Sequence, residues 1–194
     1  MSRYSCKSSL VEANPGRLLV LGLLAGGPMH GHQIRRAAEL AQIERWENVK
    51  VGALYGMLKR LAAEGLIEPV RSEQEGRFPV RTVYAITDEG RLELSLQRER
   101  ALTTPDLRSR AVEIALTWSA GLAPEELRGQ LDRRRASLEA LLAEERGRRD
   151  AEARKGPIPP AAAAGFRRTE LRLEAELGWH DELDALLEQI ASPP

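Results

Sequence analysis

The sequence has little cysteine, few aromatic residues and no long hydrophobic run. Its single cysteine, Cys6, cannot form a disulfide within the chain, so we expect a reducing environment and a cytoplasmic location. The longest apolar run, residues 18–25, is far shorter than the roughly 20 residues that cross a bilayer, and we expect no membrane partner. The first residues also lack the apolar segment of a signal peptide. Aromatic residues make up only 4% of the chain, which argues against a large β-sandwich and suits a helical protein.

An excess of charge of either sign is also lacking. The 29 Lys and Arg residues are balanced by 29 Asp and Glu residues. Residues 1–100 carry 15 basic and 12 acidic side chains, so only the first half has a small positive excess. Composition therefore favours an anionic partner weakly, and the positions of individual side chains must decide.

Three helices are predicted in the first 65 residues. Asn14 and Pro15 are favourable residues for a helix start, and the helix that follows extends to Leu24. A second, amphipathic helix extends from residue 30 to about residue 44. In the third, apolar residues recur at helical spacing until Gly65 supplies the left-handed conformation that ends a helix. The members of that apolar stripe are Val51, Leu54, Leu58 and Leu61.

A β-hairpin is predicted after the third helix. Residues 66–70 form the first strand, residues 75–79 the turn, and residues 80–86 alternate as the second strand. Arg77 then lies at or beside the hairpin tip. Thr87 caps a fourth helix, whose first turn is acidic as the positive helix end favours.

The second half of the chain is predicted to be helical. One helix carries an apolar stripe over residues 107–118, another begins at Pro124, and the last extends from about Phe166 to Ile190 after an alanine run at 161–164. We expect that one thin helical arm cannot bury all of its stripes and that a second copy covers them. The stripes are Leu107/Ala111/Ile114/Trp118, Leu127/Leu131/Leu138/Leu142 and Trp179/Leu183/Leu186/Ile190.

Three helices followed by a hairpin is the order of a winged helix-turn-helix, a fold whose third helix enters the major groove of DNA. The face of the third helix opposite its apolar stripe is small apart from one tyrosine and one lysine, which allows close approach to bases. Tyr55 can meet a sugar or phosphate, and Lys59 can meet a phosphate or guanine. The alternative is that Tyr55 packs at the core edge and Lys59 is simply solvated. This face consists of Gly52, Tyr55, Gly56, Lys59 and Ala63.

Three segments resemble the PadR family of transcriptional regulators, in the right order over about residues 17–91. They are LLVLGLLAGGPMHGHQIRR, LYGMLKRLAAEGLIEP and RTVYAITDEGR, and the later EAELGWHDELDALL resembles the family's C-terminal region. The resemblance implies a homodimer that represses genes by binding an inverted repeat, often released by a small molecule. Where the family commonly has proline and tyrosine, this chain has Gly56 and His32.

The resemblance and the pattern together give a set of candidate DNA-binding residues. They come from the start of the second helix, the third helix and the wing. The set is His30, His32, Lys50, Gly52, Tyr55, Gly56, Lys59, Arg77 and Arg81.

Other constellations give weaker signals. His30 and His32 do not share a helix face and have no accompanying Cys or carboxylate cluster, so we predict no metal site and expect His30 to cap the second helix or to meet a phosphate. Trp118 and Trp179 are interpreted first as core or interface residues, and second as the walls of a site for a flat aromatic effector. The arginines at 133–135 and 146–149 lie among glutamates, which favours solvated, ion-paired faces over nucleic-acid patches.

The sequence thus predicts a mainly α protein in three parts: a polar leader at 1–16, a winged-helix DNA-binding domain at 17–103 and a helical dimerisation and effector domain at 104–194. No phosphate loop, nucleophile elbow or paired-acid site is recognisable, so we predict a DNA-binding regulator without a cofactor rather than an enzyme. The alternative is a winged-helix protein-interaction module that does not bind DNA.

Overall fold

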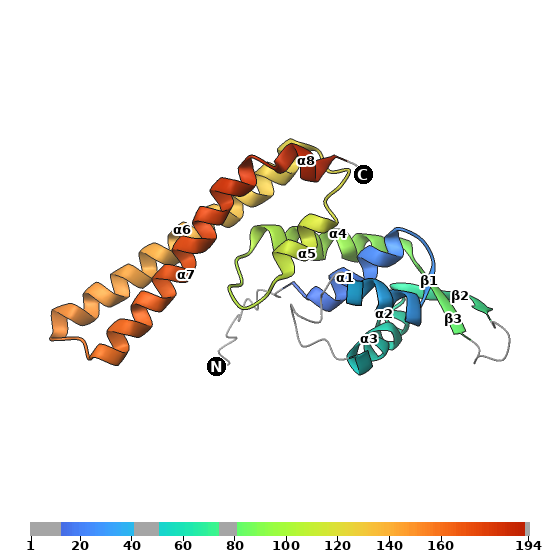
Figure 1. Ribbon diagram of the computed structural model, residues 1–194, viewed down its shortest axis with the longest axis horizontal. Helices are drawn as coiled ribbons and strands as arrows, with labels where there is room; N and C mark the ends of the chain where they lie inside the picture. Colours follow the sequence, from blue (N-terminus) through green and yellow to red (C-terminus); the bar gives the residue numbers. More distant parts are fainter. Residues whose placement is uncertain (1–12, 41–50, 74–80, 193–194) are drawn as a thin grey trace, which may run out of the picture.

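The described residues form a head, which contains the sheet, and a long two-helix arm (Figure 1). The computed structural model describes residues 13–40, 51–73 and 81–192. Within those residues no helix is both long and apolar enough to cross a membrane. The architecture is mainly helical with one small sheet, as the sequence predicts.

The head begins with three short helices, α1 (Pro15–Ala25), α2 (Gly31–Leu40) and α3 (Val51–Ala63). Asn14 caps α1 as expected, since its side chain accepts a hydrogen bond from the Arg17 amide at 3.0 Å. Six of the eleven residues of α1 are buried and none is exposed, which explains its nearly all-apolar sequence. Gly65 follows α3 with φ +75°, the left-handed conformation that ends a helix.

The sheet has one more strand than the predicted hairpin. Strands β2 (Ile67–Glu73) and β3 (Arg81–Ile86) pair antiparallel, and β1 (Met29–His30) pairs with the other edge of β3. The short β1 holds the start of α2 beside the wing, because His30 lies opposite Val83. A two-residue strand has no alternation to detect, which is why the sequence pattern missed it.

Helix α4 (Asp88–Thr103) follows the wing and leads to α5 (Ala111–Thr117). Thr87 caps α4 as predicted, accepting from the Gly90 amide at 3.0 Å and donating to the Gly65 carbonyl at 2.8 Å. The predicted helix over residues 107–118 is too long, since Leu107 and Trp118 lie on either side of the short α5.

Helices α6 (Pro124–Lys155) and α7 (Pro160–Asp184) form an antiparallel hairpin, here called the arm, and α8 (Leu187–Ala191) packs against α6 at its base. The arm projects from the head, with its free end far from the sheet (Figure 1). The prediction for the final helix was wrong at both ends. The alanine run forms the first turns of α7 behind Pro160, and the helix breaks at Ala185 before α8 begins.

Two expectations about the arm are corrected by burial. Nearly all of the predicted apolar stripes are already covered within one chain, because α4, α7 and α8 each pack against α6 and α5 packs against α4. Of these residues, Leu186 is the one that is exposed, at 45%. Arg134 is 2% exposed rather than solvated, and it donates to Glu176 at 3.0 Å.

The larger hydrophobic core extends from α1 through α5 to Leu127 and Leu187, so it crosses residue 104.

Candidate nucleic-acid interface

The outer face of α3 is the first element of the candidate site. Leu54, Leu58 and Leu61 are 4% exposed or less and hold the inner face of the helix in the core. Tyr55 is 44% exposed and Lys59, one turn later, is also exposed, so both side chains lie on the outer face as the spacing predicts. Gly56 has no atom within 4 Å of the place where a Cβ would lie, which leaves this face flat.

His30 fixes the start of α2. Its Nδ1 accepts a hydrogen bond from the Gln33 amide at 3.1 Å, and its own amide donates to the Gln33 side chain at 2.9 Å. This reciprocal pair is a capping box, so the expected capping role of His30 is confirmed. The pairing of His30 with β3 then places the amino end of α2 next to the wing.

These elements meet in a shallow groove of about 460 Å³ between α2, α3 and β3, here called the α2–α3–β3 groove. It brings together the five predicted residues whose side chains the structure describes: His30, His32, Tyr55, Lys59 and Arg81. Gly31, Leu58, Thr82 and Tyr84 complete its lining and were not predicted. Thr82 and Tyr84 are two residues apart on β3, so period-two alternation from Arg81 could not have placed them with it.

Gly31 sets the position of the tyrosine ring. A Cβ at Gly31 would lie 2.7 Å from Cε1 of Tyr55, closer than real side chains approach. The ring of Tyr55 therefore rests against the first residue of α2 and is held at the edge of the groove. A larger residue at Gly31 would displace the ring of Tyr55 from this position.

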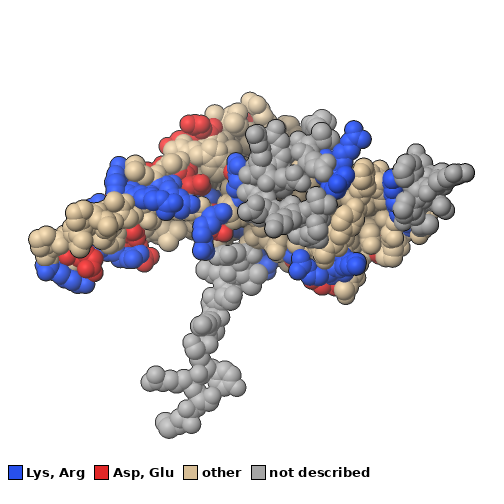
Figure 2. Space-filling model, turned by 60° about the horizontal axis from the view of Figure 1, so that its bottom comes forward, with Lys and Arg blue, Asp and Glu red and all other residues tan. Residues whose placement is uncertain are grey.

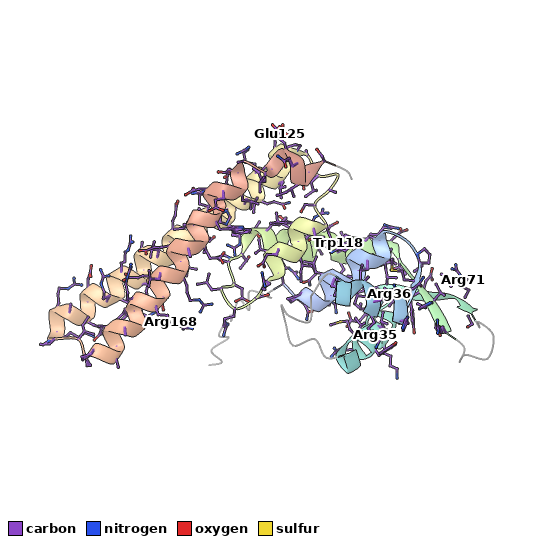
Figure 3. All side chains as sticks on the ribbon, in the orientation of Figure 1. Arg35, Arg36, Arg71, Trp118, Glu125 and Arg168 are labelled. Atoms are coloured by element: carbon purple, nitrogen blue, oxygen red, sulfur yellow. The ribbon has the colours of Figure 1, made fainter. Side chains whose placement is uncertain are left out.

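Three of the predicted DNA-binding residues have side chains that the structure does not describe. Lys50 and Arg77 lie outside the described residues, and Gly52 is placed only as a member of α3. Two further exposed arginines lie near these elements: Arg36 is on α2, and Arg71 is on β2, which pairs with β3 (Figure 3). In the sequence, the amphipathic pattern of α2 is the signal that could have pointed to Arg36.

Metal binding has no support among the described residues, which contain no group of three or more His, Cys, Asp or Glu side chains arranged to hold an ion. The His30 and His32 rings are 6.1 Å apart, and Nδ1 of His30 is already occupied by the helix cap.

The two candidate effector-site tryptophans are both partly buried against the larger core. Trp118 lies flat on α1, where a Cβ at Gly22 would be 2.5 Å from its ring. Arg98 donates to the Trp118 carbonyl at 3.0 Å. Trp179 meets His180 edge to face, with ring centroids 5.4 Å apart.

Residues 20–96, which contain the whole α2–α3–β3 groove, match the model of the transcriptional regulator PadR-like family. The chain carries a PadR-like domain. Members of this family are transcriptional regulators rather than enzymes. The match ends within α4, so α5–α8 lie outside it.

Similar proteins are found both by sequence and by structure. An uncharacterised 37.1 kDa protein in transposon TN4556 of Streptomyces fradiae is 38% identical over 81 residues, which cover 42% of this chain but only 21% of that protein. Bacillus subtilis PadR in complex with operator DNA is 20% identical, with a TM-score of 0.41 over 88% of this chain and 96% of that one. The PadR-like regulator BC1756 from Bacillus cereus is 22% identical, with a TM-score of 0.36 over 93% and 98%.

Proposed function

We propose that this protein is a sequence-specific DNA-binding regulator that represses transcription as a homodimer on an inverted repeat. The observation that carries the proposal is the α2–α3–β3 groove, which gathers two histidines, a tyrosine, a lysine and an arginine on one face of a PadR-like domain. Residues 17–103 would bind DNA, and residues 104–194 would hold the dimer and respond to an effector. Residues 1–16 would be a leader.

The geometry suits a helix in the major groove. With the outer face of α3 against the bases, Tyr55 and Lys59 would reach the sugar–phosphate edge or guanine, and the missing side chain of Gly56 would permit close approach. Arg81 lies on β3 beside the same groove, and the described part of the wing ends there. Arg36 on α2 and Arg71 on β2 would add phosphate contacts.

A gel-shift titration with the DNA upstream of the protein's own gene tests this proposal. We expect a discrete complex that survives competition by a large excess of unrelated duplex and weakens with salt, because phosphate contacts release counterions. A chain that binds both duplexes equally, or neither, would instead favour the protein-interaction module.

Dimerisation is the second part of the proposal. Leu141 and Leu171 on the arm and Leu186 just after it are between 40% and 49% exposed, which is apolar surface that a second copy would cover. Two linked heads turn the second half-site contact into an intramolecular one and can raise the affinity by about a hundredfold. Light scattering of the full chain at micromolar concentration should give the mass of two chains.

An aromatic effector is the third part. The indole rings of Trp118 and Trp179 lie half-buried where α5 and α7 meet the core, so a flat ligand that enters there would stack on them and disturb the packing of α1. Compounds that quench tryptophan fluorescence should lower operator affinity in parallel. Trp118→Phe and Trp179→Phe, tested separately, would identify the ring that reports binding, and an aromatic library that quenches neither would refute the effector site.

A further inference from the structure

A single arginine joins three helices of the head. Arg17 lies in the first turn of α1, and its guanidinium lies between two carboxylates. Its Nη1 is 2.6 Å from Oε2 of Glu64, directly after α3, and its Nε donates to Oε1 of Glu93 on α4 at 3.2 Å. The side chains of Arg17 and Glu93 are only 20% and 21% exposed, so water screens their attraction less than at an open surface. Arg17, Glu64 and Glu93 are here called the Arg17 clamp.

A buried glutamine holds the clamp on α4. Nε2 of Gln97 donates to the same Glu93 oxygen at 2.9 Å, and Oε1 of Gln97 accepts from the Asn14 amide at 2.7 Å. Gln97 is 3% exposed, which fixes these bonds inside the head. The amino end of α1 is therefore attached to α4 twice, through the backbone of Asn14 and through the side chain of Arg17.

The clamp connects α4 to the end of α3. Helix α1 lies between these two helices (Figure 1), and α3 packs chiefly on α1, α2 and β2. An acid at the carboxyl end of a helix is unfavourable by itself, because that end carries a partial negative charge. The guanidinium of Arg17 offsets this effect at Glu64 and holds the end of α3 at a fixed place relative to α4.

We propose that the Arg17 clamp positions α3 for DNA recognition, and that Arg17 and Glu64 act through α3 rather than through DNA contacts of their own. This inference rests on the proposed DNA binding. Lys59 precedes Glu64 by about 7 Å of helix rise, so a shift at this end of α3 would also move Lys59 and Tyr55. Contacts to base edges depend on hydrogen-bond geometry, and displacements of less than 1 Å, by order of magnitude, weaken them.

Substitution of Glu64 separates positioning from a simple charge effect. On the face of the head in Figure 2, Lys and Arg side chains are prominent and few Asp or Glu side chains are seen. If Glu64 were only an acid near such a surface, Glu64→Gln would strengthen binding to every duplex. If the clamp positions α3, Glu64→Gln should bind the operator about tenfold more weakly and should not weaken binding to unrelated DNA.

Fluorescence anisotropy of the full chain measures both affinities, with the DNA upstream of the protein's own gene and an unrelated duplex as probes. Arg17→Lys keeps the charge, but one ammonium lacks the forked geometry that joins two carboxylates, so the operator affinity should again fall about tenfold. The double variant Arg17→Lys/Glu64→Gln should lose no more than either single variant, because both changes break the same link. Glu68→Gln is the matched control, an exposed acid on β2 outside the clamp, and should not weaken operator binding.

Thermal unfolding of each variant shows whether the fold is kept, and we expect midpoints close to that of the wild type. A folded Glu64→Gln variant that binds the operator as tightly as the wild type, or more tightly, would overturn the positioning role and leave the proposed DNA binding standing. Losses that add in the double variant would overturn it too, since Arg17 and Glu64 would then act separately. If Glu64→Gln does not fold, Arg17→Lys decides in its place. A wild-type chain that does not distinguish the two duplexes would overturn both proposals.

Discussion

At the scale of single residues, the proposed DNA contacts depend on side chains that line the α2–α3–β3 groove. Lys59 could be any solvated lysine on a helix. It lies one turn after Tyr55, in a groove shared with His32 and Arg81, and this position supports the proposed phosphate contact.

Lys59→Ala should weaken binding to all duplexes alike and lower the slope of log affinity against log salt by about one, because one phosphate contact is lost. Fluorescence anisotropy at several salt concentrations measures the slope, and Lys59→Arg should restore it. Arg108→Ala is the matched control, since that side chain is 82% exposed in the loop after α4. An unchanged slope for Lys59→Ala would remove Lys59 from the interface.

His180 makes stability depend on pH. Its ring, 2% exposed, lies 3.4 Å from Arg134, and burial together with that positive charge lowers the pKa of His180 from 6.5 to about 4. Arg135 lowers this pKa further, while Asp184 and Asp181 raise it. Arg134 donates, so the neutral ring accepts, and protonation would remove the acceptor and add a second positive charge.

Because the unfolded chain then binds the proton more readily than the folded one, stability should fall as pH drops from about 6.5 to about 4, by up to about 3 kcal/mol. Urea unfolding across this range measures the effect. His180→Gln keeps a hydrogen-bonding group without titrating, so the loss within this window should shrink. If His180→Gln shows the same pH dependence as the wild type, another group is responsible.

At the scale of elements, regular periodicity was the reliable guide. The leucine spacing of α3, the Asn14 cap, Gly65 and the Thr87 cap all fix local structure through neighbours in sequence, and each prediction is confirmed. Strand β1 depends on pairing with the distant β3, which periodicity does not encode.

The residues of the candidate site likewise include some that the sequence could predict and some that it could not. Tyr55, Lys59 and Arg81 could be selected from faces and family motifs, and the structure gathers them in one groove. Tyr84 could not be selected, because its place depends on the pairing of β3 with β1. The burial of Arg134 was missed for a related reason: its partners, Glu176 and His180, lie on the other helix of the arm.

The junction between the wing and α4 explains the glycine of the TDEGR motif and gives an element-level prediction. A Cβ at Gly90 would lie 2.0 Å from the Leu66 carbonyl oxygen, a backbone atom that already accepts from the Thr87 amide. Gly90→Ala should therefore force β2 away from α4 and cost about 3 kcal/mol of unfolding free energy, measured by urea denaturation.

Gly129→Ala is the matched control for this prediction. It is also a glycine within a helix, but no atom lies within 4 Å of its Cβ position. It should stabilise the protein by up to about 1 kcal/mol through helix propensity alone. Equal stability of the two variants would contradict the close packing of α4 on the start of β2.

At the scale of the whole molecule, the head and the base of the arm share one core. Leu102 of α4, Ala115 of α5 and Leu127 of α6 belong to the same buried cluster, together with Leu187 of α8. A change in how the arm is held would therefore reach α1 and α4 through direct contacts. This continuity would give the proposed effector or dimer contacts a physical route to the proposed DNA-binding face.

The most direct test of the whole account is a DNase I footprint of the full chain on the DNA upstream of its own gene. A two-fold dimer carrying one α3 per protomer should protect two inverted half-sites whose centres are about 10 base pairs, or a multiple of that, apart. Both half-sites should become protected at the same protein concentration, and Tyr55→Ala combined with Lys59→Ala should abolish both. Protection of a single unpaired site, or footprints that the double substitution leaves unchanged, would contradict a dimer that reads DNA through the face of α3.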